Sequence, residues 1–124
     1  MIVALVDDLM FRSRIQSAAR GVGADVRFVT APDAAVSLIH LNAPALVIVD
    51  LNAVRLAPLR VVAEVKADPS LASTVIIGFV SHVDAETIAA ARAGGVDEVL
   101  ARSAFVMQLP ALLGRDDAQR EGGA

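Results

Sequence analysis

The chain of 124 residues contains no cysteine, tryptophan or tyrosine, and only four phenylalanines. Without cysteine there can be no disulfide, no thiolate metal site and no cysteine nucleophile. The scarcity of aromatic rings removes the surfaces on which single-stranded nucleic acid stacks. The formal net charge of −3 also provides no basic face for a phosphate backbone. We therefore expect no direct binding to nucleic acid.

Long apolar runs are missing as well. The apolar segment at the start covers residues 1–6 and ends on two acids, which makes it too short for a signal peptide or a membrane span. We expect a cytoplasmic, soluble protein with no membrane contact. The length fits a single domain with a substantial core. Because 56% of the residues are apolar and few are aromatic, that core is predicted to be aliphatic.

The most informative stretch that is present is Ala-Leu-Val-Ile-Val-Asp at residues 45–50. Consecutive branched apolar residues predict a strand buried on both faces, as in the centre of a parallel sheet. Similar runs recur along the chain, and one alternating segment is typical of a strand near an edge. The five predicted strands cover residues 2–6, 25–29, 45–50, 75–80 and 96–100.

Apolar residues at helical spacing predict a helix after each strand. With right-handed crossovers, this alternation requires an α/β fold with five helices on both faces of a parallel sheet. Pro110 leaves two alternatives for the last helix: it begins near Val106, with the proline in its first turn, or it is kinked. From Gly114 onward there is no apolar periodicity, so we expect one domain over 1–113 and a disordered tail over 114–124.

Polar side chains follow the predicted strands. The first strand ends on Asp7 and Asp8, the third on Asp50, the fourth before Ser81 and the fifth before Arg102. Because ligands gather beyond the carboxyl ends of parallel strands, we expect three carboxylates to converge there. At about 5 Å each pair would repel by about 3 kcal/mol in an effective dielectric of about 20. A bound dication would relieve this repulsion, or one carboxyl would stay protonated.

These strand ends, together with the runs Val6-Asp7-Asp8 and Gly95–Leu100, resemble the receiver domain of bacterial two-component response regulators. The resemblance covers residues 1 to about 113. It implies a flavodoxin-like, doubly wound five-stranded sheet with strand order 2-1-3-4-5. It also implies a stand-alone signalling module rather than an enzyme. Phosphatases that use an aspartate nucleophile carry Asp-x-Asp at this strand end, whereas this chain has Asp50-Leu-Asn52.

The resemblance also implies a role for each residue at the strand ends. Mg²⁺ prefers oxygen ligands and usually keeps several waters, so two carboxylates and a carbonyl suffice to bind it. The implied roles are phosphoacceptor for Asp50, Mg²⁺ ligands for Asp7, Asp8, Asp50 and the carbonyl of Asn52, and switch and phosphate contacts for Ser81 and Arg102.

Three positions depart from the family pattern. Arg102 stands where a lysine is usual, Ser103 where a proline is usual, and Val99 where an aromatic residue rotates in the family. A cis bond before serine would cost about 2.5–4 kcal/mol, so we expect a trans bond there. Arg102 could also pair with Asp50 or Asp8 without any phosphate. These departures favour a second hypothesis, a phosphorylation-independent pseudo-receiver that acts as a binding scaffold.

The implied partners are proteins. A histidine kinase or a phosphotransfer protein would donate the phosphoryl group. A downstream protein would bind the face formed by the fourth helix, the fifth strand and the last helix. The fourth helix is rich in alanine over residues 89–93, which would also suit a homodimer.

Overall fold

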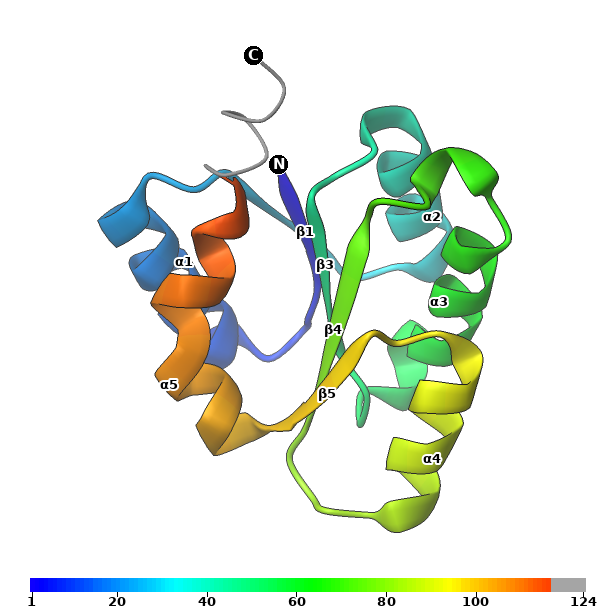
Figure 1. Ribbon diagram of the computed structural model, residues 1–124. Helices are drawn as coiled ribbons and strands as arrows, with labels where there is room; N and C mark the ends of the chain where they lie inside the picture. Colours follow the sequence, from blue (N-terminus) through cyan, green and yellow to red (C-terminus); the bar gives the residue numbers. More distant parts are fainter. Residues whose placement is uncertain (117–124) are drawn as a thin grey trace.

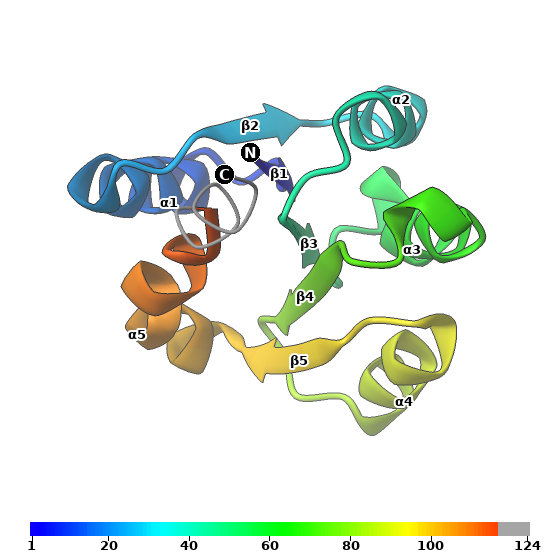
Figure 2. The same cartoon turned by 45° about the horizontal axis from the view of Figure 1, so that its top comes forward.

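The computed structural model describes residues 1–116. Five parallel strands form one sheet in the order β2-β1-β3-β4-β5, as predicted (Figures 1 and 2). The edge position of β2 agrees with its alternating sequence, and the continuous apolar runs form the inner strands. The strands are β1 (Ile2–Leu5), β2 (Val26–Val29), β3 (Leu46–Asp50), β4 (Val75–Val80) and β5 (Glu98–Ala101).

Five α-helices connect or follow the strands and cover both faces of the sheet. Helices α1 and α5 lie on one face, and α2, α3 and α4 lie on the other (Figures 1 and 2). The described helices are α1 (Leu9–Val22), α2 (Pro32–Asn42), α3 (Pro58–Lys66), α4 (Ala85–Gly94) and α5 (Arg102–Leu113), with short 3₁₀ turns at Val54–Leu56 and Pro69–Leu71. None of the helices within residues 1–116 is long and apolar enough to cross a membrane.

The core consists of two aliphatic layers, one on each side of the sheet. Alternate residues of the same strand contribute to opposite layers: Val47 and Val49 face α2 and α3, whereas Leu46 and Ile48 face α1 and α5. All four are at most 1% exposed. This burial on both faces explains why β3 reads as a continuous apolar run.

Local capping sets several boundaries as the sequence indicates. The carboxylate of Asp8 accepts the N–H of Phe11 at 3.0 Å and caps α1, and Asp84 caps α4 in the same way. Strand β5 begins later than predicted, at Glu98. Just before it, the side chain of Asp97 accepts the N–H of Ile76 at 2.8 Å.

The structure rules out one of the two alternatives for the last helix, namely a start near Val106. Helix α5 begins at Arg102, so Pro110 lies in its interior and supplies no N–H to the helix. The early start brings Phe105 into the core, where it is fully buried. The peptide bond between Arg102 and Ser103 is trans, as expected, because no cis bond occurs in the described chain.

The ordered domain continues past the predicted boundary at residue 113. The carboxylate of Asp116 is fully buried, pairs with the ammonium group of Met1 and accepts the N–H of Asp25 at 2.9 Å. This corrects the predicted start of the tail, because a buried charged anchor holds residues 114–116 against the amino end of the sheet. Residues 117–124 of the predicted tail lie outside the described residues.

Candidate functional site

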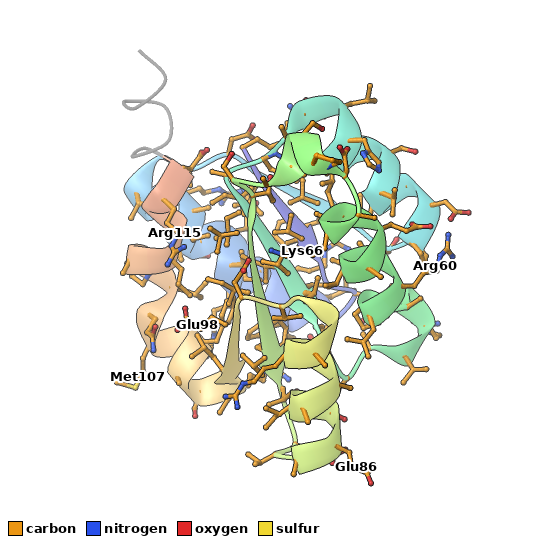
Figure 3. All side chains as sticks on the ribbon, turned by 45° about the vertical axis from the view of Figure 1, so that its right-hand side comes forward. Arg60, Lys66, Glu86, Glu98, Met107 and Arg115 are labelled. Carbon is orange, nitrogen blue, oxygen red and sulfur yellow. The ribbon has the colours of Figure 1, made fainter. Side chains whose placement is uncertain are left out.

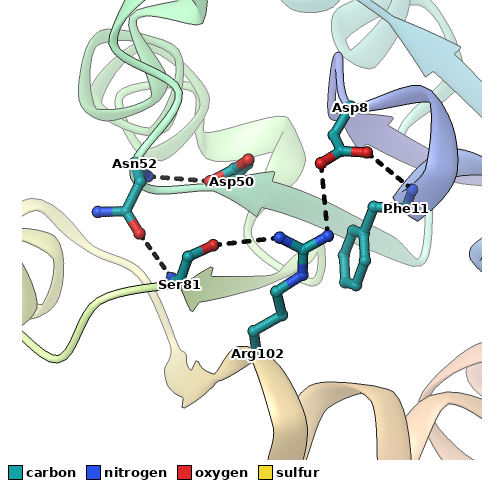
Figure 4. A network of polar contacts seen from close by, with 6 residues as sticks. All are labelled: Asp8, Phe11, Asp50, Asn52, Ser81 and Arg102. Carbon is teal, nitrogen blue, oxygen red and sulfur yellow. Dashed lines mark hydrogen bonds and ion pairs between the residues drawn. The ribbon is translucent and has the colours of Figure 1, made fainter.

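The site lies at the carboxyl edge of the sheet, where β1 and β3 are neighbours. Leu5 pairs in register with Val49, so the loop after β1 and the end of β3 emerge side by side. Asp8 precedes α1, Asp50 ends β3, and Arg102 begins α5 directly after β5. Figure 4 shows these side chains together with Ser81, which follows β4. The predicted meeting of the strand ends is therefore confirmed.

Asp50, at the end of β3, is partly buried. Burial is the main cause that raises its pKa, and the negative charges of Asp7 and Asp8 act in the same direction. The N–H of Asn52, 3.0 Å from Oδ1 of Asp50, and the charge of Arg102 oppose this rise. Asp50 is thus a carboxylate whose charge the folded state tolerates poorly.

This raised pKa predicts that Asp50→Asn stabilises the fold at neutral pH. A group whose pKa is higher in the folded state binds protons more readily there, so its contribution to stability is lost as the pH rises through that pKa. The difference between the variant and the parent chain should therefore shrink as the pH is lowered towards 4. Urea unfolding at several pH values measures it. A less stable variant at pH 7 would contradict the expectation.

Asp8 uses both of its carboxylate oxygens. Oδ1 accepts the N–H of Phe11, and Oδ2 lies 3.4 Å from Nη2 of Arg102. The N–H of Phe11 is the main cause that lowers the pKa of Asp8, and Arg102 lowers it further. Asp8 is consequently charged at neutral pH and already has a cationic neighbour.

Asp7 also has a cationic neighbour. Nη2 of Arg55, from the turn after β3, lies 2.9 Å from Oδ2 of Asp7. The arginine is 87% exposed, so water screens this pair strongly. At this edge of the sheet Arg55 is thus paired with Asp7, and Arg102 with Asp8.

Arg102 contacts an aromatic ring as well as polar groups of the site. Its guanidinium lies over the ring of Phe11, 4.3 Å from the centroid, and its Nη1 donates to Oγ of Ser81 at 3.5 Å (Figure 4). The sequence suggested Asp50 or Asp8 as the acidic partner of Arg102, and the structure shows a contact with Asp8. No ion pair joins Arg102 to Asp50 within residues 1–116.

The ring of Phe11 on which the guanidinium of Arg102 lies belongs to a buried cluster of three phenylalanines. The ring of Phe11 lies 4.6 Å from that of Phe79 and 5.7 Å from that of Phe105, and these two stack at 5.0 Å. All three are at most 3% exposed. Sequence reasoning missed this cluster because its members come from α1, β4 and α5 and share no spacing. The scarcity of aromatic residues was the only available signal.

Asn52 links the loop after β3 to the loop after β4. Its side-chain Oδ1 accepts the N–H of Ser81 at 2.6 Å, and its carbonyl accepts the N–H of Val54 at 3.0 Å (Figure 4). The resemblance implied a role for the carbonyl of Asn52 only. The side chain adds a second contact, because it binds the N–H of Ser81 while the backbone N–H of Asn52 donates to Asp50.

A glycine in β4 makes room for the residue after Asp50. A Cβ atom on Gly78 would lie 2.7 Å from Cδ1 of Leu51, so the leucine packs directly on the backbone of β4. The N–H of Leu51 also donates to the carbonyl of Phe79 at 3.0 Å. These contacts continue the β3–β4 pairing past Asp50 and hold its backbone in place.

The oxygen donors of the site suit Mg²⁺ in kind. Carboxylates and a backbone carbonyl are hard ligands of the type that this ion prefers. Within residues 1–116, however, no three acidic or imidazole side chains are arranged so that they could hold one metal ion. To bind the ion, Asp8 would have to give up its contact with Arg102. Asp50 could keep the hydrogen bond that it accepts from the N–H of Asn52.

Comparison with solved structures identifies the class of fold. A response regulator from Hahella chejuensis matches with a TM-score of 0.82 at 16% sequence identity, over 91% of either chain. The phosphorylated cyanobacterial phytochrome response regulator RcpA matches with a TM-score of 0.75 at 24% identity, over 90% of this chain and 86% of that one. The Mn²⁺-bound form of response regulator Rcp1 matches with a TM-score of 0.75 at 16% identity, over 91% of either chain.

The chain thus has the fold of response-regulator receiver domains, which confirms the resemblance at the level of architecture. No protein-family model matches the sequence, and no curated protein matches it.

Proposed function

We propose that the chain is a receiver-like signalling domain in which Asp50 accepts a phosphoryl group. The donor is a phosphohistidine of a histidine kinase or a phosphotransfer protein in the cytoplasm. The observation that carries the proposal is the meeting of Asp50 with Asp8, Ser81 and Arg102 at one edge of a receiver fold (Figure 4). A domain of this kind is an acceptor in a relay, so we expect no catalytic turnover of a substrate.

In the proposed step a carboxylate oxygen of Asp50 attacks phosphorus and forms an acyl phosphate. The bond from phosphorus to the imidazole nitrogen breaks, and its electron pair stays on that nitrogen. Asp7, Asp8, Asp50 and the carbonyl of Asn52 would hold Mg²⁺, whose positive charge would offset the negative charge of the phosphoryl oxygens.

Two side chains of the site are suited to the new phosphoryl oxygens. Arg102 already points its guanidinium into the site, and the hydroxyl of Ser81 lies beside that guanidinium (Figure 4). Because Ser81 lies in the loop between β4 and α4, a movement of Ser81 towards the phosphoryl group would shift that loop and stretch the hydrogen bond from its N–H to Asn52. In this way phosphorylation of Asp50 would change the conformation of a surface loop that a partner protein can contact.

The surroundings of the site favour a protein partner. Apolar side chains that are at least 75% exposed come from the loops and helix ends around this edge, and Met107 projects outward from α5 (Figure 3). These side chains form a rim that consists of Leu9, Met10, Val54, Val83 and Met107. Such an exposed apolar rim suits a protein that covers the site during transfer.

The partner that reads the signal would bind elsewhere. A downstream protein, or a second copy of the chain, would use the face of α4, β5 and α5.

The direct test is incubation with acetyl phosphate and Mg²⁺, followed by mass spectrometry of the intact protein. We expect the mass to rise by one phosphoryl group and the modified peptide to contain Asp50. Asp50→Asn should abolish the gain completely, whereas Asp25→Asn, at the other end of the sheet, should leave it unchanged. Beryllofluoride, which imitates the acyl phosphate, should change the NMR spectrum of the parent chain but not that of Asp50→Asn.

The second candidate function is a phosphorylation-independent scaffold with the same fold. The observation in its favour is that Arg102 contacts Asp8 and Ser81 without any phosphate. Val99 also removes the aromatic side chain that the resemblance would require at that position. Absence of both the mass gain and the beryllofluoride response in the parent chain would favour the scaffold.

A further inference from the structure

The guanidinium of Arg102 lies against Oδ2 of Asp8, one of the residues proposed above as metal ligands. We propose that this guanidinium is a tethered cation that competes with a divalent ion for Asp8 and so weakens metal binding at this site. The inference rests on the proposed function, because it concerns the metal ligands named there. It adds a specific regulatory residue: the metal enters only when Arg102 leaves Asp8.

The geometry of Asp8 makes the competition direct. One oxygen, Oδ1, is committed to the N–H of Phe11, and losing that bond would uncap α1. The other oxygen, Oδ2, is the one that Arg102 approaches at 3.4 Å. A metal ion and a guanidinium cannot both lie against one carboxylate oxygen without placing like charges side by side. A metal ion on Oδ2 would displace the guanidinium of Arg102, and a metal ion on Oδ1 would share that oxygen with the N–H that caps α1.

The phenylalanine cluster makes this cation persistent. The guanidinium stacks on Phe11, whose ring is fixed by Phe79 and Phe105, so the favourable position of Arg102 does not depend on Asp8 alone. A planar guanidinium suits this stacking, and a lysine ammonium in its place would be a hydrated point charge on a flexible stem. The substitution of arginine for the usual lysine thus acquires a physical consequence.

Arg55 provides the internal comparison. It also contacts one of the acids implied as metal ligands, but it lies on no aromatic ring in residues 1–116 and its side chain is 87% exposed. It can move into solvent at little cost when a cation approaches Asp7. We therefore assign the competition with the metal ion to Arg102, and we do not expect every positive charge near the site to have this effect.

The proposal predicts that Arg102→Gln binds Mn²⁺ about fivefold more tightly than the parent chain. Mn²⁺ serves as the probe because free Mn²⁺ gives an electron paramagnetic resonance signal that disappears on binding. Arg55→Gln, the matched control, should change the affinity less than about twofold. Phe11→Leu, which removes the stacking surface but keeps Arg102, should shift the affinity in the same direction as Arg102→Gln.

Equal affinities of the parent chain and Arg102→Gln would overturn the inference, and so would equal gains in Arg102→Gln and Arg55→Gln. Undetectable binding in every variant would overturn it as well. These results are separate from the test of Asp50. If Mn²⁺ binds more tightly to Arg102→Gln while Asp50 takes no phosphoryl group, the proposed function fails and the tethered cation stands.

Discussion

Replacement of Asp116 with alanine is expected to lower the free energy of unfolding by about 3–5 kcal/mol. The carboxylate is fully buried and pairs with the ammonium group of Met1, and it also accepts the N–H of Asp25. Removing one member of a buried ion pair leaves the other charge without compensation in a poorly solvated place. Because the chain has no tryptophan or tyrosine, urea unfolding should be followed by far-ultraviolet circular dichroism.

Two further variants make this expectation specific. Asp25→Ala removes a carboxylate at the same end of the sheet, but this side chain is 52% exposed and lies 3.7 Å from Arg27, so its loss should cost less than about 0.5 kcal/mol. Asp116→Asn keeps an acceptor for the N–H of Asp25 and removes only the charge, so it should cost less than Asp116→Ala. A loss below about 1 kcal/mol in Asp116→Ala would show that the anchor is not important for stability.

Replacement of Phe79 with alanine is expected to destabilise the fold by about 3–5 kcal/mol. Phe79 is 1% exposed on the inner strand β4, and its ring contacts both Phe11 and Phe105. The truncation removes apolar contacts and leaves a cavity among rings that cannot collapse fully onto it. The same denaturation measurement applies, with the slope against urea expected to stay constant.

Phe28→Ala is the matched control, because it makes the same truncation on the edge strand β2. Phe28 is only partly buried, and the guanidinium of Arg12 lies 5.1 Å from its ring centroid. Its loss should cost about 1–2 kcal/mol. If both truncations cost the same, the phenylalanine cluster would have no special role in the core. Loosening Phe11 through Phe79→Ala should also raise the Mn²⁺ affinity, as we expect for Phe11→Leu.

Much of the architecture could be predicted from local patterns. The continuous apolar run 45–50 indicates a strand covered on both faces, and the handedness of the crossovers then restricts the topology to a doubly wound sheet. The parallel direction brings all carboxyl ends to one edge, which is why Asp8, Asp50 and Arg102 could be expected together. The order of the strands came from the resemblance, not from periodicity.

Other features could not be predicted because they depend on contacts between distant segments. Pro110 argues locally for a late helix start, but the burial of Phe105 and Leu109 against the sheet favours a helix from Arg102. The polar residues after Gly114 suggest a tail, yet one of them, Asp116, finds the ammonium group of Met1. In both cases tertiary packing outweighs a local preference.

The sequence by itself determined the elements, their alternation and the carboxylates at the strand ends, because hydrophobic period, caps and crossover handedness act over short distances along the chain. Only the tertiary structure decided how those side chains are shared. It directs Arg102 to Phe11 and Asp8, and it joins Asn52 to the loop of Ser81. Such choices depend on the rotamer and on the position of a neighbour from another element, and no spacing in the sequence specifies either.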